Sequence, residues 1–245
     1  MAPRWQRIVI STHFDDAALS VSGFLARQAA ATAIVTVFGG LPASTDKASG
    51  WDSQCGFDSA ADAARSRQRE DALACQILGA DQVMLPYPDT PYLAEAEHTE
   101  LTELTGFLAD HVTAGTQVLV PAGIGNVDHM KVSDWALSAL RTLTTGEILL
   151  YADLPYSVAH PEWPGDIGGM FAPGRLEQVL ERNLPAYRIT ASDTVALTVA
   201  EWRCKRAAIF AHASQLALLG SEYELFLAFP GSLQHEALLS VTSSG

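Results

Sequence analysis

The segment RIVISTHFDD (residues 7–16) joins a short apolar run to a polar turn, and this junction is the most informative feature of the sequence for the fold. Arg7–Ser11 is short and rich in β-branched residues, as is typical of a strand buried in a parallel sheet. Residues 17–30 follow with the spacing of small and apolar residues that is typical of a helix. The segment therefore predicts a strand that ends in a polar turn and leads directly into a helix.

The same alternation of strands and helices continues as far as residue 151. Further strands are expected at residues 34–38, 82–85, 117–121 and 148–151, and helices at residues 59–79, 97–112 and 131–143. This order favours a Rossmann-like α/β fold, with a mostly parallel sheet and helices on both of its faces. At 245 residues the chain is expected to form a single domain, residues 1–245.

The pattern is more irregular from about residue 153. Residues 153–174 are rich in proline and glycine and are expected to form a long loop. Helices are then expected at residues 175–183 and 199–219, with a short strand at 187–190 between them. A second long loop is expected at residues 39–56, and loops of this length in a compact domain are usually functional.

The composition excludes several classes of protein. Hydrophobic residues make up 48% of the chain and charged residues 18%, which excludes a disordered chain. The 15 Lys and Arg residues against 28 Asp and Glu give a formal charge of −13, so we expect neither nucleic acid nor an anionic membrane surface as a partner. The first residues lack the pattern of a signal peptide, and the three cysteines fit reduced thiols; both indicate a cytoplasmic protein.

The polar turn after the first strand carries residues that can hold a metal ion. His13 and Asp16 are three residues apart across a tight turn at the carboxyl end of a strand, where ligands bind in open α/β sheets. Imidazole and carboxylate groups are ordinary ligands of catalytic zinc, and Asp15 could accept a proton from a water molecule held there. The alternative is that Asp15 and Asp16 cap the helix that follows.

A second polar segment, GIGNVDH (residues 123–129), lies between a predicted strand and a predicted helix. It is therefore also expected at the carboxyl end of the sheet, where His129 can supply a third metal ligand. Asp128 can hold a ring nitrogen or a group of the substrate, and the glycines allow the backbone to approach a ligand closely. A glycine-rich turn with a capping aspartate is the alternative, but two such turns at strand ends favour one shared metal centre.

These two segments resemble the signatures of a known family. HFDDA (residues 13–17) resembles the HPDDE signature of the PIG-L/LmbE-like zinc-dependent N-deacetylases, and NVDH (residues 126–129) resembles their HxDH signature. Further matches follow in chain order: Arg67, Glu70, Ala74, Leu78 and Gly79 for an RxxE…A…LG helix, Pro88 and Asp89 for a PD step, and KRAAIFAHASQ (residues 205–215) for a helix ending in HxSQ. YADLPY (residues 151–156) is similar to the YEDLPY stretch of a bacterial subgroup with HFDDA.

The resemblance implies a role for each matching residue. Three positions would bind Zn²⁺ and leave one coordination position open for water: His13, Asp16 and His129. Two carboxylates would complete the site, Asp15 as general base and Asp128 as support for the base or the site. Three further positions match residues that contact a sugar substrate in the family: Ser20, Arg67 and Asp89. The reaction would be hydrolysis of an N-acyl group, typically N-acetyl on an amino sugar, to a free amine and acetate.

The sequence departs from the family signatures at two positions. Ala17 replaces the glutamate that closes HPDDE, as in other HFDDA members, and Asn126 replaces the first histidine of HxDH. In the family that histidine stabilises the oxyanion of the tetrahedral intermediate. Asn126 can donate a hydrogen bond from its amide but carries no positive charge, so we expect it to serve as the oxyanion donor in a slower or differently tuned reaction.

The expected function is zinc-dependent removal of an N-acetyl group from an amino sugar or from a glycosylated small molecule such as a natural-product intermediate. Trp51 and Trp163 lie in the two long loops and are expected to pack against the apolar part of such a substrate, although each can equally anchor its loop on the core. Two alternatives stay open: a zinc amidase that acts on a non-sugar amide, and a metal- or ligand-binding relic with impaired catalysis. The oligomeric state is also open, a homo-oligomer included.

Overall fold

Seven strands form one mostly parallel sheet in the computed structural model, which describes residues 4–93, 100–165, 170, 178, 187–222 and 227–243. The parallel strands are β1 (Arg7–Ser11), β2 (Thr32–Thr36), β3 (Ala80–Met84), β4 (Gln117–Pro121) and β5 (Glu147–Tyr151). Two further strands, β6 (Tyr187–Ala196) and β7 (His235–Ser243), extend the sheet beyond β5, in the order β3-β2-β1-β4-β5-β7-β6, and β7 pairs antiparallel with both of its neighbours. The expected α/β fold with a mostly parallel sheet is thereby confirmed.

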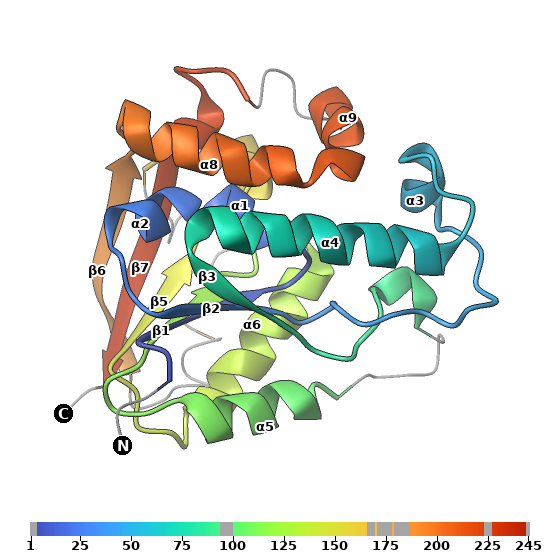
Figure 1. Ribbon diagram of the computed structural model, residues 1–245. Coiled ribbons are helices and arrows are strands. Elements are labelled where there is room, and N and C mark those ends of the chain that lie inside the picture. Colours follow the sequence, from blue (N-terminus) through green and yellow to red (C-terminus); the bar gives the residue numbers. More distant parts are fainter. Residues whose placement is uncertain are drawn as a thin grey trace.

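Helices cover both faces of the sheet (Figure 1). One layer contains α1 (Asp16–Ser20), α2 (Ser22–Arg27), α4 (Ala60–Leu78) and α8 (Val199–Ala211), and α9 (Ala213–Glu222) follows α8. The other face carries α5 (Thr102–His111) and α6 (Val127–Leu140), and the short α3 (Gly50–Gln54) lies near the start of α4. No helix in the described part of the chain is long and apolar enough to cross a membrane.

Alternate residues of the central strands face opposite helix layers, which explains why β1 is apolar along its length. Ile8 and Ile10 pack in the same hydrophobic cluster as residues of α5 and α6. Val9 of β1 and Leu119 of β4 point to the other face and pack with residues of α1, α2 and α4. Because both faces of these strands are buried, polar side chains that serve a function collect at the strand ends.

The helix expected at residues 17–30 is in fact two helices that meet at Val21. This residue has φ −137° and ψ 5°, so the first backbone N–H groups of α2 lack partners within a helix. The Glu236 carboxylate of β7 accepts hydrogen bonds from two of them, Gly23 N at 2.9 Å and Phe24 N at 2.7 Å. A residue more than 200 positions away in the sequence therefore stabilises the break, which no local pattern could indicate.

The helix expected at residues 199–219 is interrupted in the same way. It ends at Ala211, His212 takes a non-helical conformation with ψ 50°, and α9 begins at Ala213. Both the backbone N and the Oγ of Ser214 donate to the carboxylate of Glu70 in α4, at 2.9 and 2.8 Å. The second break is thus also stabilised by a glutamate from a distant helix.

The C-terminal half shows further differences from the expectation. The strand expected at residues 187–190 extends to residue 196 and pairs with β7, for which no expectation existed. The two long loops are not wholly irregular, because α3 lies in the first and the 3₁₀ helix η2 (Tyr156–Ala159) lies in the second. The helix expected at residues 175–183 falls outside the described residues except for residue 178.

Glu236→Gln is expected to destabilise the fold strongly. The Nζ atom of Lys205 lies 3.0 Å from Glu236 Oε1, and both side chains are buried, so the variant leaves an ammonium group without a counter-charge. Removing one partner of a buried ion pair costs about 3–5 kcal/mol of unfolding free energy, which chemical denaturation measures. Arg65→Gln removes one partner of an exposed pair with Asp62 and should have little effect. Equal losses in the two variants would contradict this role of Glu236.

Candidate metal centre

The two polar turns of the sequence meet at one edge of the sheet. The chain passes from β1 to β2 on one side, and β4 later pairs with β1 on its other side. Ligands of open α/β sheets bind outside the carboxyl ends of such a pair of strands, where the strand order reverses. Residues from the turn after β1 and from the turn after β4 line one cleft at this position.

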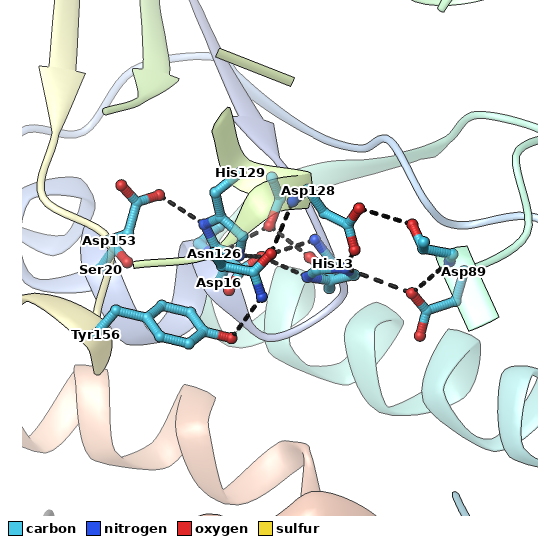
Figure 2. Close-up of polar contacts among 12 residues, drawn as sticks. His13, Asp16, Ser20, Asp89, Asn126, Asp128, His129, Asp153 and Tyr156 are labelled. Atoms are coloured by element: carbon cyan, nitrogen blue, oxygen red, sulfur yellow. Dashed lines mark hydrogen bonds and ion pairs between the residues drawn. The ribbon is translucent and has the colours of Figure 1, made fainter. Parts of the chain in front are cut away.

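The three expected metal ligands lie together in this cleft (Figure 2). The Oδ2 atom of Asp16 is 3.3 Å from His13 Nδ1 and 3.2 Å from His129 Nε2. One ligand atom from each of the three residues lies within 4.8 Å of the other two. Asp16 and His129 are buried, whereas the His13 side chain is 21% exposed, so the group opens to solvent only on the His13 side.

The ring of His129 is oriented by a residue that the sequence analysis did not single out. Its Nδ1 atom lies 2.6 Å from Oδ1 of the buried Asp153, which follows β5. The other oxygen of Asp153 accepts a hydrogen bond from Ile124 N at 2.8 Å, so this carboxylate holds both the ring and the turn after β4. His129 Nε2 is buried and has no hydrogen-bond partner in the described part of the chain. A buried nitrogen without a partner, next to a carboxylate and a second imidazole, fits a metal ligand.

The charges of the cluster also favour a cation. Burial opposes the charge on Asp16, but His129 and His13 hold the pKa of its carboxyl well below the usual value. Burial likewise opposes protonation of His129, yet Asp16 and Asp153 raise the pKa of its imidazole to about 10. Without a metal, the negative charge of the carboxylates thus favours the protonated form of the imidazoles. A metal ion takes the place of those protons, which is the usual coupling between metal binding and ligand pKa.

Asp15 lies in the same cleft and does not cap the helix. It occupies the N-cap position of α1, but its side chain makes no capping hydrogen bond. Asp16, in the first turn of α1, accepts from His13 N at 2.7 Å, which precedes the helix, so neither aspartate caps α1 with a side-chain hydrogen bond. Burial and the neighbouring Asp16 raise the pKa of the Asp15 carboxyl to about 6.

Asp128 and Asp89 lie on the far side of His13. The Nε2 atom of His13 is 3.4 Å from Asp89 Oδ1 and 3.6 Å from Asp128 Oδ2. Thr90 Oγ1 donates to Asp128 Oδ1 at 2.7 Å and joins the two aspartates. Burial opposes their charge, but the contacts with His13 lower the pKa of both carboxyls. The two carboxylates therefore face the nitrogen of His13 that points away from Asp16.

Asn126 connects the metal cluster to the loop after β5. Its Oδ1 accepts a hydrogen bond from Asp128 N at 2.8 Å and caps α6, which is why this helix begins at Val127 rather than near residue 131. Its Nδ2 donates to the hydroxyl of Tyr156 at 3.1 Å. Both ends of the amide are thus engaged at the wall of the cleft.

The expected substrate contacts divide into two groups. Arg67, Asp89 and Trp51 line the cleft, and Arg67 forms an ion pair with Asp52 of α3. Ser20 is buried in α1, where its Oγ accepts a hydrogen bond from Leu154 N at 3.0 Å.

Trp163 belongs with Ser20 in the second group. Its indole nitrogen donates to Ser232 O at 3.1 Å, and its ring packs against the core. Neither side chain lines the cleft in the described part of the chain.

Three residues of the site received no role in the sequence analysis: Asp52, Asp153 and Tyr156. Asp52 accepts a hydrogen bond from the hydroxyl of Tyr92 and pairs with Arg67, so it holds α3 over the cleft. Asp153 and Tyr156 belong to the YADLPY stretch, which attracted attention only through its resemblance to the family. That stretch follows β5, the strand next to β4 in the sheet, and this position was a usable signal.

Comparisons with known proteins agree with this geometry. The model of the PIG-L family, described as GlcNAc-PI de-N-acetylase, matches residues 8–140, which is more than half of the 245-residue chain. The search of curated proteins found no match. The matched segment contains the whole His13, Asp16 and His129 cluster.

Several solved structures share the fold. A deacetylase of the teicoplanin biosynthesis pathway is 22% identical with a TM-score of 0.73, over 97% of this chain and 98% of that one. The A40926 pseudoaglycone deacetylase is 22% identical with a TM-score of 0.71, over 99% of both chains. A 4-carboxy-2-hydroxymuconate hydratase from Pseudomonas putida is 17% identical with a TM-score of 0.54, over 96% of this chain and 95% of that one.

At these identities the likeness shows the fold alone, and the hydratase shows that this fold carries more than one reaction. The family match is the stronger finding because it covers both ligand-bearing turns. On that match the chain belongs to the PIG-L family of de-N-acetylases.

Proposed function

We propose that this protein is a zinc-dependent enzyme that hydrolyses the N-acetyl group of an amino sugar carried by a glycosylated small molecule. One observation carries the proposal: two turns far apart in the sequence bring His13, Asp16 and His129 together, with Asp15 in the same cleft. Two imidazoles and a carboxylate are a ligand set of catalytic zinc. When bound, Zn²⁺ supplies a Lewis acid that activates water and polarises the acyl carbonyl.

Asp15 is placed to move the proton of this reaction. Asp15 lies in the cleft beside the metal cluster, where a carboxylate can take a proton from water and return it. As the water oxygen bonds to the acyl carbon, Asp15 takes a proton from the water, and an electron pair of the C=O bond moves onto the carbonyl oxygen. When this pair re-forms the C=O bond, the carbon–nitrogen bond breaks and Asp15 gives the proton to the nitrogen. The products are acetate and the free amine.

The charge of the cleft indicates a substrate without phosphate. Carboxylates dominate the lining: Asp15, Asp16, Asp52, Asp89 and Asp128. Arg67 is the one lysine or arginine among the described residues that line the cleft, and Asp52 already balances it. A phosphoinositide, which the family description names, suits neither this cleft nor a chain with a formal charge of −13. A neutral N-acetylated glycoside suits both.

The walls of the cleft indicate that the sugar carries an apolar group. Aromatic and apolar side chains stand beside the polar cluster: Trp51, Pro91, Tyr92 and Leu219. Such surfaces pack against rings or alkyl groups of a ligand. The relatives from the teicoplanin pathway and the A40926 pseudoaglycone deacetylase support a substrate of the same general kind, a glycosylated natural-product intermediate.

The three cysteines are free, in keeping with work in the reducing cytoplasm.

The test of the function compares two variants of the site. Asp15→Asn should keep zinc, because Asp15 is not a ligand, and should lose activity by about 10²–10⁴-fold, because an amide cannot take the proton. His129→Ala should lose the zinc itself. Elemental analysis and mass-spectrometric detection of acetate release from a panel of N-acetyl amino sugars and their glycosides give both results.

The controls separate the alternatives. Wild-type protein that binds zinc but releases no acetate from any compound would support the relic and overturn the deacetylase. An Asp15→Asn variant with full activity would place the base elsewhere. Undiminished zinc in His129→Ala would show that the metal site is misassigned.

Asp153→Asn is expected to weaken zinc binding while the fold persists. The amide can still accept from Ile124 N, but it does not carry the negative charge that faces His129 Nδ1. Loss of such a partner typically costs about 10–100-fold in metal affinity. Competition for Zn²⁺ with a chromophoric chelator measures the change, and circular dichroism checks the fold. Wild-type affinity in the folded variant would show that Asp153 only supports the turn.

Trp51→Ala is expected to raise KM for a glycoside with a bulky apolar group and to leave KM for free N-acetylglucosamine nearly unchanged. The reason is that Trp51 lines the cleft on α3 and is not one of the metal-cluster residues. Trp163→Ala is the matched control, since both indoles pack against the same hydrophobic cluster but Trp163 does not line the cleft in the described part of the chain. It should lower the Tm without changing the preference between the two substrates. The same preference in Trp51→Ala as in wild type would remove Trp51 from substrate selection.

A further inference from the structure

Tyr156 stands at the metal cluster on the cleft side. It opens η2 and lines the cleft, and its ring meets the edge of His129 with centroids 5.2 Å apart at 76°. Figure 2 shows its hydroxyl beside Asn126, at the end of the ring that points toward the cluster. The phenol is close enough to interact electrostatically with Asp16 and His13. Its hydroxyl therefore faces the space in which the reacting amide has to sit.

The hydrogen-bond pattern fixes the direction of the Tyr156 hydroxyl proton. Asp128 N can only donate, so the Asn126 atom that faces it is Oδ1. The atom of Asn126 that faces Tyr156 is then Nδ2, which can only donate, so the tyrosine oxygen accepts. The hydroxyl proton of Tyr156 must point elsewhere. No acceptor for it is present among residues 4–93, 100–165, 187–222 and 227–243.

The backbone makes room for this side chain. Gly125 has φ +75°, a conformation that favours glycine, and a Cβ atom there would lie 2.7 Å from Cβ of Tyr156. The turn after β4 thus has no side chain at the point where Tyr156 packs against it. The hydrogen bond from Asn126 and the contact with the His129 ring then position the tyrosine ring, as an oxyanion donor requires.

We propose that Tyr156 is the catalytic residue that donates a hydrogen bond to the acyl oxygen as negative charge develops on it. The inference rests on the proposed N-deacetylation. When water adds to the acyl carbon, the carbonyl electron pair moves onto oxygen, and the O–H of Tyr156 stabilises that charge without transferring its proton. The phenol is neutral and protonated at neutral pH, so the donor is ready before the reaction begins.

Asn126 takes a different part from the one its place in the motif suggests. Its Oδ1 caps α6 and its Nδ2 binds the Tyr156 oxygen, so it acts on the reaction through the tyrosine and is a positioning residue. A hydroxyl that accepts one hydrogen bond becomes a better donor of the next, which adds to the effect. In this chain the pair of Asn126 and Tyr156 does the work that the sequence analysis assigned to Asn126 alone.

The kinetic test uses Tyr156→Phe, Asn126→Ala and the double variant on an N-acetyl amino sugar that the wild type hydrolyses. Loss of one oxyanion donor should lower kcat by about 10²–10³-fold, with zinc content and KM unchanged. Because Asn126 acts through Tyr156, the double variant should be no slower than Tyr156→Phe. Tyr87→Phe is the control, since it removes a buried hydroxyl whose partner is Glu103 N, outside the cleft, and kcat should not change.

A binding test gives a readout that does not need turnover. The methylphosphonamidate of glucosamine carries a tetrahedral phosphorus with charged oxygens where the reaction develops its oxyanion. Calorimetry should show its affinity for Tyr156→Phe falling by the same factor as kcat/KM, about 10²–10³-fold, as expected for a transition-state analogue. Glucosamine itself has no such oxygen and should bind wild type and variant equally.

The outcomes separate this inference from the proposed function. If the wild type deacetylates its substrate and Tyr156→Phe does so at nearly the same rate, the function stands and the role of Tyr156 is wrong. Losses that multiply in the double variant would make Asn126 an independent donor and overturn its positioning role. If the wild type is inactive, the proposed function fails. Equal binding of the phosphonamidate by wild type and Tyr156→Phe would then overturn the inference as well.

Discussion

The carboxylate of Asp16 joins the two halves of the site. Its Oδ2 accepts a hydrogen bond from His13 N at 2.7 Å and lies 3.3 Å from His13 Nδ1 and 3.2 Å from His129 Nε2. One buried oxygen is thus shared by the turn after β1 and the turn after β4. A buried charge is costly unless it is paired. If either turn moved away, the buried Asp16 carboxylate would lose a partner, so the two turns stabilise each other's position. Asp15 and Asn126 take their positions in the cleft from these two turns.

Carboxylates from distant parts of the chain fix the other irregular points of the fold. Asp153 binds Ile124 N in the turn after β4, Glu236 binds the first N–H groups of α2, and Glu70 binds Ser214 at the start of α9. In each case regular structure stops and leaves backbone N–H groups that need a buried partner. The acidic composition of the chain is therefore only partly a surface property. Several of its carboxylates accept hydrogen bonds from backbone N–H groups and so stabilise the fold.

The sequence predicted where the site lies better than it predicted all of the residues that form it. Residues 7–16 and 117–129 each show an apolar strand that ends in a polar turn, and this local pattern suffices to place His13 and His129 at adjacent strand ends. Tyr156 belongs to a proline-containing loop whose course depends on contacts with Gly125 and Asn126, and no periodicity describes such contacts. The helix breaks depend in the same way on distant glutamates. Ser20 was assigned from the resemblance to the family alone, and its burial against Leu154 N is a tertiary contact that no motif shows.

One ion pair affects both the charge and the apolar wall of the cleft. Arg67 was expected to meet the sugar, but its charge is balanced by Asp52, which also accepts the hydroxyl of Tyr92. An arginine held in this way can donate hydrogen bonds to sugar hydroxyls, yet it offers no net charge to a phosphate. Trp51 is the neighbour of Asp52 in α3, so the ion pair that neutralises Arg67 also keeps the indole at the rim of the cleft. Loss of this pair would leave Arg67 without its counter-charge and α3 without one of the contacts that hold Trp51 at the cleft.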